Sequence, residues 1–164
     1  MKYPQLVVCG FDDWIANQLR ELASETRWLL NDVRLTTAIA GHLEALRPTV
    51  LLLQADPTSP KLDVLETLAE VHRRSPDVPI VVLSDAKLPD ELRANWTASV
   101  LDLGACCVLF PPYTRLLLED LVTGLMTATI RRTIGEPVPT PNVAPKSTTE
   151  ETIDLAEGHY EEPS

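Results

Sequence analysis

The sequence predicts an α/β domain in which a central parallel sheet is covered by helices on both faces. Five short apolar runs alternate along the chain with segments whose apolar residues recur at helical spacing. The run at 49–53 lacks the polar alternation of a half-exposed strand, and the run at 79–83 is rich in β-branched residues, so both are typical of central, buried strands. A length of 164 residues suits one domain of this class.

Each strand is predicted from a short apolar run, and each helix from apolar residues at helical spacing. Asp12 or Asp13 is expected to cap the first helix, and Thr114 the last, by accepting hydrogen bonds from free backbone N–H groups. Gly104 is expected to end the fourth helix. The predicted strands are 5–9, 32–37, 49–53, 79–83 and 106–110, and the predicted helices lie at about 14–22, 41–46, 62–74, 89–103 and 114–132.

Composition excludes several classes of protein. No apolar run reaches the roughly 18–20 residues that a membrane span requires, and no signal-peptide pattern develops at the start, so we expect a cytoplasmic protein with no membrane partner. The net charge of −10 disfavours nucleic acid. Cys9, Cys106 and Cys107 lack metal-binding spacing, and we expect them to be small buried apolar residues.

The composition changes near the end of the chain. Residues 1–134 have the character of a folded domain, whereas residues 135–164 are rich in proline, serine, threonine and acids. So little apolar surface does not offset the entropy of ordering, which predicts a disordered acidic tail. The alternative is a short docking peptide centred on Ile153, Leu155 and Tyr160.

Three stretches narrow the choice among flavodoxin-like folds. Residues 37–53 (TAIAGHLEALRPTVLLL), 79–84 (PIVVLS) and 103–113 (LGACCVLFPPY) occur in an order and spacing that resemble the receiver domains of two-component response regulators, which are CheY-like. The resemblance covers about residues 4–132. It implies a flavodoxin-like (βα)5 three-layer sandwich whose five parallel strands have the order 2-1-3-4-5.

The resemblance also implies a phosphorylation site at the carboxyl ends of the strands. In that family an acidic pair after the first strand holds Mg²⁺, and an aspartate at the end of the third strand accepts the phosphoryl group. The motifs here place Cys9 and Gly10 at the acidic pair and Gln54 at the acceptor position. An amide cannot serve as a carboxylate nucleophile.

The remaining family positions are also altered. Pro111 stands where the family has a lysine that contacts the phosphoryl group, and Val108 stands where it has an aromatic switch residue. Only Ser84 matches, at the family's Thr/Ser position. These replacements predict a pseudo-receiver that has no catalytic residues, binds no metal and does not undergo aspartyl phosphorylation.

A shift of alignment register leaves an alternative open. Asp12, Asp13 and Asp56 lie two or three residues beyond the family positions, and a longer strand or a bulge would bring them to the strand ends. The chain would then be a divergent phosphorylatable response regulator of a phosphorelay, with Asp56 as acceptor and Asp12 or Asp13 for Mg²⁺. Otherwise these residues are helix caps and a turn residue. A flavodoxin-like binder of a small ligand is a further alternative.

The leading interpretation is a receiver-like signal-transduction domain that acts by protein–protein interaction, is not an enzyme and needs no cofactor. We expect it to bind a signalling protein partner, or to form a homodimer, through the surface of residues 89–132. Helices with apolar residues on more than one face suggest an interface. The residues that cannot all face one sheet are Trp96, Val100, Leu116, Leu118, Val122 and Ile130.

Overall fold

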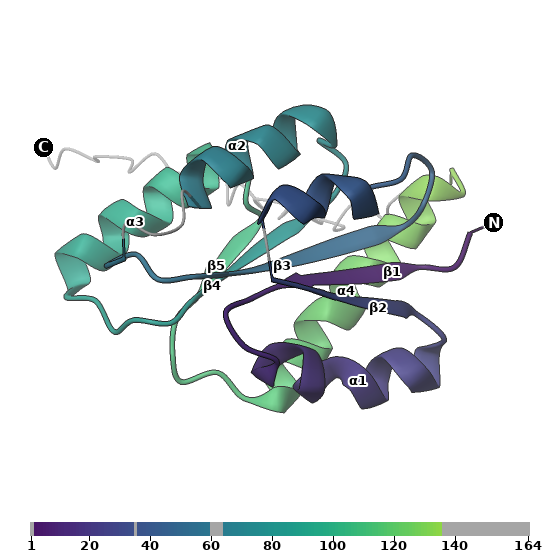
Figure 1. The fold of residues 1–164 in the computed structure, drawn as a ribbon, viewed down its shortest axis with the longest axis horizontal. Helices are drawn as coiled ribbons and strands as arrows, with labels where there is room; N and C mark the ends of the chain where they lie inside the picture. The colour runs from purple at the N-terminus through teal and green to yellow at the C-terminus, as the bar shows by residue number, and fades with distance from the viewer. Residues whose placement is uncertain (1, 35, 60–63, 136–164) are drawn as a thin grey trace, which may run out of the picture.

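The computed structural model describes residues 2–34, 36–59 and 64–135, and the elements below belong to these ranges. A parallel sheet lies between two layers of helices (Figure 1). Its strands are β1 (Gln5–Cys9), β2 (Leu29–Val33), β3 (Thr49–Ala55), β4 (Ile80–Ser84) and β5 (Cys107–Leu109). The helices are α1 (Trp14–Thr26), the 3₁₀ helix η1 (Thr36–His42), α2 (Val64–Arg74), α3 (Asp90–Asp102) and α4 (Arg115–Thr133). Most of the predicted tail lies outside the described residues.

The predicted fold class and strand order are confirmed. The five described strands are parallel and have the order β2-β1-β3-β4-β5. In the register of the central strands, Cys9 of β1 lies opposite Leu53 of β3, and Gln54 lies opposite Leu83 of β4. The carboxyl ends of all these strands therefore meet at one edge of the sheet.

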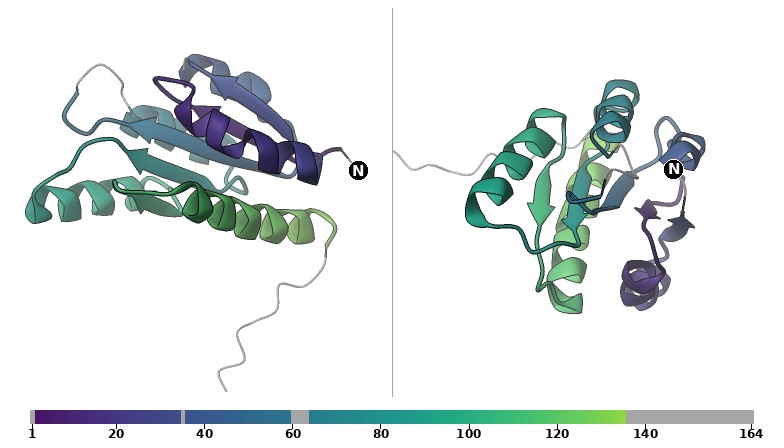
Figure 2. Two further views of the ribbon diagram at one scale, coloured as in Figure 1. Left: turned by 90° about the horizontal axis from the view of Figure 1, so that it is seen from below. Right: turned by 60° about the vertical axis from the view of Figure 1, so that its left-hand side comes forward.

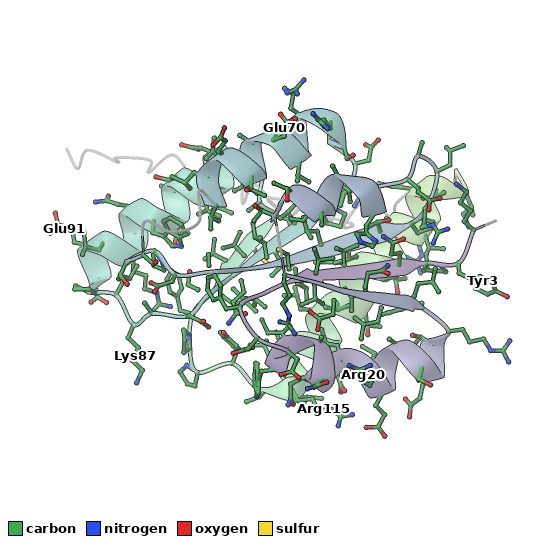
Figure 3. All side chains as sticks on the ribbon, in the orientation of Figure 1. Tyr3, Arg20, Glu70, Lys87, Glu91 and Arg115 are labelled. Carbon is green, nitrogen blue, oxygen red and sulfur yellow. The ribbon has the colours of Figure 1, made fainter. Side chains whose placement is uncertain are left out.

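Two apolar clusters fill the spaces between the sheet and its helices. Alternate residues of β3 point to opposite faces, so Leu52 packs with α1 and α4, whereas Leu53 packs with η1, α2 and α3. Figure 2 shows α1 and α4 side by side on their face of the sheet. Arg115, at the start of α4, lies beside α1 (Figure 3) and pairs with Glu21 at 2.5 Å.

The second strand and second helix differ from the sequence prediction. The strand is Leu29–Val33 rather than 32–37, and a 3₁₀ helix at Thr36–His42 replaces the helix expected at 41–46. The strand begins early because Arg27, with φ 58°, ends α1 in a left-handed conformation. As an edge strand, β2 buries only Val33 fully, so it lacks the continuous apolar run that marks the central strands.

The helix ends follow the expected chemistry in most respects. Thr114 Oγ1 accepts a hydrogen bond from the N–H of Leu117 at 3.2 Å, and Gly104 follows α3 with φ 109°. At α1 the N-cap is Asp13, but its side chain makes no capping bond. Asp12 Oδ1 instead accepts from the N–H of Trp14 at 3.0 Å.

None of the described helices is long and apolar enough to cross a bilayer. The expectation that all the cysteines are buried is wrong for Cys106, which is exposed because it occupies a bend just before β5.

Candidate functional site at the carboxyl ends of the strands

Gln54 occupies the middle of the edge where the strands end. Its side chain is 4% exposed, and both halves of its amide are engaged. Oε1 accepts from the backbone N–H of Phe11 at 2.9 Å, and Nε2 donates to Oδ2 of Asp85 at 2.7 Å. One buried amide thus joins the loop after β1 to the loop after β4. A buried polar group with its partners satisfied in this way stabilises the arrangement of both loops.

Gly10 makes room for this amide. A Cβ atom added at Gly10 would lie 2.6 Å from Gln54 Oε1 and 3.2 Å from the carbonyl oxygen of Asp12. Any side chain at position 10 would therefore displace the Gln54 amide from its bonds. Gly10 and Gln54 are thus sterically dependent on each other.

Asp85 extends the hydrogen-bond network to the start of α4. Its Oδ1 accepts from the hydroxyl of Tyr113 at 3.2 Å. Burial raises the pKa of Tyr113 to about 12, with further contributions from the charge of Asp85, its hydrogen bond and the charge of Asp12. The Tyr113 ring also packs against Trp14, with ring centroids 5.7 Å apart. The loops that follow β1, β4 and β5 are therefore joined through Gln54 and Asp85.

Ser84 is fully buried at the end of β4, on the opposite face of the sheet from Gln54. Its Oγ accepts from the indole N–H of Trp96 at 2.9 Å. Trp96 belongs to α3 and packs against the core of that face. The hydroxyl at the family's Thr/Ser position is therefore tied to a helix rather than directed at the strand-end edge.

The other predicted family positions carry little reactive chemistry. Cys9 is buried, and burial raises the pKa of its thiol to about 11 despite the opposing charge of Arg34. Val108 packs against the core cluster of α2 and α3. Pro111 is half-buried and precedes Pro112 through a cis peptide bond. At neutral pH the Cys9 thiol stays protonated.

Two of the three aspartates of the register alternative, Asp12 and Asp56, bond to their own loops, and the side chain of Asp13 makes no capping bond. Asp56 Oδ1 accepts from the backbone N–H of Thr58 at 2.8 Å and from its hydroxyl at 2.6 Å, and these bonds lower the pKa of Asp56. Asp12 bonds to Trp14, as described above. Within the described parts of the chain, no three His, Cys, Asp or Glu side chains are grouped so that they could hold a metal ion.

The residues at the family's metal positions do not fit Mg²⁺. This hard cation takes oxygen ligands, chiefly carboxylates. Cys9 offers a buried thiol and Gly10 offers no side chain, while the one oxygen of the Gln54 amide already accepts from Phe11. No chemical step is therefore assigned to a metal at these positions.

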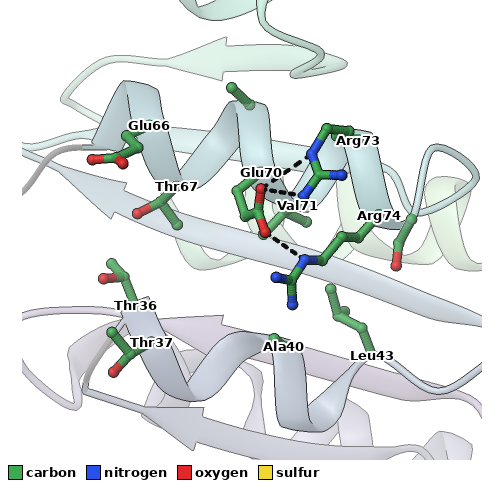
Figure 4. Close-up of a pocket in the computed structure, with 12 residues that line it drawn as sticks. Thr36, Thr37, Ala40, Leu43, Glu66, Thr67, Glu70, Val71, Arg73 and Arg74 are labelled. Carbon is green, nitrogen blue, oxygen red and sulfur yellow. Dashed lines mark hydrogen bonds and ion pairs between the residues drawn. The ribbon is translucent and has the colours of Figure 1, made fainter.

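A cleft of about 910 Å³ lies elsewhere, between η1 and α2 (Figure 4). Its lining includes Thr36, Ala40 and Leu43, and on the α2 side Glu70, which forms ion pairs with Arg73 at 2.8 Å and with Arg74. The lining contains none of the strand-end residues of the Gln54 network. The small-ligand alternative, which placed a ligand at the strand ends, gains no support from this cleft.

Solved structures with a similar fold include several receiver domains. The signal receiver domain of a putative LuxO repressor protein from Vibrio parahaemolyticus aligns with TM-score 0.65 and 11% identity over 84% of this chain and 100% of that one. The BeF₃-activated receiver domain of DrrB aligns with TM-score 0.61 and 15% identity over 77% and 99%. NtrX from Brucella abortus, in complex with ADP, aligns with TM-score 0.62 and 16% identity over 85% of this chain.

The chain spans 31% of that NtrX chain and 64% of the response regulator StyR. No protein-family model matches the sequence, and no curated protein matches it. At these low identities the structural likeness defines the fold and nothing finer. The chain has the fold of the response-regulator receiver, CheY-like, domains.

Sequence reasoning missed the partners that hold Gln54 and Ser84 in place. Asp85 and Tyr113 complete the network, and Trp96 was named only among the apolar residues that cannot all face one sheet, not as a partner of Ser84. One signal was available for Asp85, because it directly follows a buried strand and so lies at the strand-end edge. No spacing rule points to Trp96 or Tyr113, since both come from elements distant in sequence from the atoms that they bond.

Proposed function

We propose that this domain is a pseudo-receiver, a signalling module that presents a protein-interaction surface without Mg²⁺-dependent aspartyl phosphorylation. It would act without catalysing a reaction. The observation that carries the proposal is the Gln54 amide, buried at the acceptor position and bonded on both sides to Phe11 and Asp85. An amide held in this way offers neither a nucleophilic carboxylate nor space for a phosphoryl group.

The same network supports a fixed arrangement of the proposed surface. Asp85 opens the loop that leads to α3, and Tyr113 directly precedes the N-cap of α4. Gln54 therefore links, through Asp85, to the starts of both helices that flank β5. In a phosphorylatable receiver such a link would have to be made by the phosphoryl group, whereas here it is part of the folded chain.

The surface formed by α3, β5 and α4 has the character of an interface. Val100, Leu118 and Val122 are fully buried, so they are core residues rather than interface residues. Others of this segment are exposed: Leu92 (54%), Leu101 (43%), Leu116 (66%) and Leu117 (43%). Large apolar side chains left in water on the two helices that flank β5 favour a protein partner as the ligand of this surface.

Phosphorylation chemistry tests the first part of the proposal. The protein is incubated with acetyl phosphate and Mg²⁺, and intact mass is measured, with a phosphorylatable receiver domain treated in parallel as a positive control. We expect the control to gain a phosphoryl group and this chain to gain none. A stable acyl phosphate on any aspartate of this chain would refute the pseudo-receiver.

The phosphorelay alternative makes a distinct prediction for the same experiment. If Asp56 is the acceptor, labelling occurs in the natural chain and disappears in Asp56→Asn. Asp77→Asn, at a turn distant from the strand ends, is the matched control. Labelling that survives Asp56→Asn would remove Asp56 as the acceptor while still refuting the pseudo-receiver.

The surface is tested separately by light scattering coupled to gel filtration. If the partner is a second copy of the chain, we expect a concentration-dependent dimer that is weakened by the double change Leu101→Ser and Leu116→Ser. A monomer at all concentrations, unaltered by these changes, assigns the surface to a different protein. Equal weakening of a dimer by changes at Leu29, an exposed residue on the opposite edge strand, would refute the assignment to α3 and α4.

A further inference from the structure

The ends of α1 and α4 meet the starts of β1 and β2 at the amino-terminal edge of the sheet, opposite the edge of the candidate site. Leu29, the first residue of β2, donates its N–H to the carbonyl oxygen of Pro4, just before β1, at 2.9 Å. The helices α1 and α4 lie side by side (Figure 2), and each follows the carboxyl end of a strand, so both run back toward this edge. Trp28 and Ile130, near their ends, pack against the same apolar cluster.

Exposed apolar side chains gather at this edge. Tyr3, which precedes β1, Leu29, and Ile134, which follows α4, are all exposed. A single exposed apolar residue needs no explanation, but three that come from different elements at one edge have the character of a docking surface.

Three arginines at the same edge lack a partner in the described ranges. Arg27 directly follows α1, and Arg131 and Arg132 lie in the last turn of α4. None of the three forms an ion pair with a described carboxylate, whereas the other described arginines all have a carboxylate, amide or aromatic partner. The guanidinium groups left unpaired in the described domain are thus all at one edge. We call the amino-edge patch the set Tyr3, Arg27, Leu29, Arg131, Arg132 and Ile134.

Residues 150–162, with the sequence EETIDLAEGHYEE, have the complementary chemistry. The segment contains no lysine or arginine, and its apolar residues Ile153 and Leu155 stand on either side of an acid. Residues 135–164 carry seven acids and one lysine, a net charge of −6 out of −10 for the chain, which leaves −4 for residues 1–134. Because the folded domain is itself acidic, an attraction must be local, within the screening length of about 8–10 Å. The amino-edge patch offers such a local group of cations.

The chain leaves the described domain at this same edge. Ile134 belongs to the patch, and the 14 residues 136–149 separate Gly135 from Glu150. Fully extended, such a connection reaches about 46–50 Å, whereas packed helices are about 8–10 Å apart. A segment tethered through a connection of this length has an effective concentration on the order of millimolar. Even weak binding to its own domain would therefore outcompete binding to a second copy at micromolar concentration.

We propose that residues 150–162 bind to the amino-edge patch of their own chain, with Ile153 and Leu155 against Leu29 and Ile134 and the acids beside the three arginines. The proposal takes the alternative of a docking peptide over that of a solvated tail. It does not rest on the proposed pseudo-receiver function. Exposed ion pairs contribute little singly, so the apolar contacts and the tether supply most of the binding and the arginines select the acidic segment.

The apolar contacts are tested by nuclear magnetic resonance on the full ¹⁵N-labelled chain. The double change Ile153→Ser and Leu155→Ser should lower the docking equilibrium constant by about tenfold or more. We therefore expect backbone amide resonances of residues 27–30 and 130–134 to shift, and those of α3 to stay in place. These serines lie outside the described residues, so every described core contact is kept.

Val138→Ser and Val143→Ser together are the matched control, because they make the same kind of change in the connecting residues 136–149. This control should leave the patch resonances in place. Unshifted patch resonances in the Ile153 and Leu155 variant, or equal shifts in the control, would overturn the proposal.

The charge contacts are tested from the other side. Arg131→Gln and Arg132→Gln together should shift the amide resonances of residues 150–162, and 1 M NaCl should shift them in the same direction, because it shortens the screening length to about 3 Å. Lys87→Gln is the control. Lys87 is an exposed cation in the loop after β4 and forms no ion pair in the described ranges, and Figure 3 shows it and Tyr3 at opposite ends of the molecule. Tail resonances that respond equally to both variants would contradict a local attraction to this patch.

A mixing experiment distinguishes the chain's own segment from that of a second copy. The ¹⁵N-labelled Ile153→Ser and Leu155→Ser variant is mixed with an equal amount of unlabelled natural chain at about 50 μM. If the segment binds to its own domain, the patch resonances of the labelled variant should stay at their shifted positions. Their return toward the natural positions would assign the patch to the segment of a second copy and refute binding within one chain.

Discussion

At the scale of single residues, the candidate site depends on one amide that has two different partners. Gln54 accepts from Phe11 through oxygen and donates to Asp85 through nitrogen, so the polarity of the side chain matters as much as its length. A carboxylate of the same length can accept from Phe11 but cannot donate to Asp85. The site is thus selective for glutamine over glutamate.

Gln54→Glu is predicted to destabilise the fold at neutral pH by about 1–3 kcal/mol, because two oxygens then face each other in place of an N–H donor and an acceptor. Asp85 and burial raise the pKa of the introduced carboxyl above its unfolded value of about 4.3. The protonated form of the introduced carboxyl can donate to Asp85. The loss of stability should therefore be smallest below the unfolded pKa and should grow as pH rises through the raised folded pKa. The free energy of unfolding in urea, determined at several pH values, measures this loss.

Gln18→Glu on α1 is the control for this experiment, and we expect it to change stability by less than about 0.5 kcal/mol. If Gln54→Glu were as stable as the natural chain at pH 7, the hydrogen bond between Gln54 and Asp85 would be contradicted.

Tyr113 gives a second prediction at this scale. Its pKa is raised to about 12, so its protonated form is favoured by folding. The stability that it contributes should be intact below its unfolded pKa of about 10 and be lost as pH rises from there to about 12. Phenolate absorbance during alkaline titration measures the ionisation, and Tyr113→Phe assigns it.

Asp85→Asn should lower the pKa of Tyr113 but leave it above the ordinary value, since burial is the largest cause of the shift. A transition already at the ordinary tyrosine pKa in the natural chain would contradict both the partial burial of Tyr113 and its hydrogen bond to Asp85.

At the scale of elements, two glycines have different effects on the helices in which they lie or which they follow. Gly104 follows α3 with φ 109°, and a Cβ there would lie 2.2 Å from the ring of His72. Gly124 lies within α4, where an added Cβ would meet nothing within 4 Å. The backbone conformation at position 104 requires glycine, whereas Gly124 only lowers the helix propensity of α4.

Gly104→Ala is therefore predicted to destabilise the fold by about 1–2 kcal/mol, largely because the backbone conformation disfavours a side chain. Gly124→Ala is predicted to stabilise it by about 0.5–1 kcal/mol through helix propensity. Thermal unfolding followed by circular dichroism compares the two variants. Changes of the same sign would show that the end of α3 is not held in the described conformation.

The elements predicted best from sequence were those with the most uniform surroundings. The run at 49–53 identified β3 because that strand is buried on both faces, and a strand buried on both faces has a continuous run of apolar residues. The edge strand β2 and the 3₁₀ helix η1 were misplaced because their residues are only partly buried, so apolar periodicity weakens there. The positions of Gln54 and Ser84 could be predicted, whereas their partners depend on how distant loops meet.

At the scale of the whole molecule, the sheet is shared by two cores. Leu52 and Leu53 are neighbours in β3, but they belong to the α1–α4 cluster and the α2–α3 cluster respectively. Loss of packing on either face therefore acts on the same strand. This arrangement predicts that the described domain unfolds as one unit.

Leu52→Ala and Leu53→Ala should each reduce the free energy of unfolding by about 2–5 kcal/mol. In both variants, urea transitions followed by tryptophan fluorescence and by far-ultraviolet circular dichroism should coincide. Trp28 and Trp96 make this comparison informative, because they pack against different clusters. Separate transitions for the two signals would show that the two cores melt independently.

The contact between Gly10 and Gln54 determines how this edge of the sheet can change by single substitutions. Gly10→Asp alone would place the new Cβ atom 2.6 Å from Gln54 Oε1. The Gln54 amide would then have to move, and its hydrogen bond from the Phe11 N–H would break. Gln54→Asp alone shortens the side chain and clears that space. An engineered or evolutionary path toward an acidic site therefore has a preferred order, in which position 54 changes before position 10.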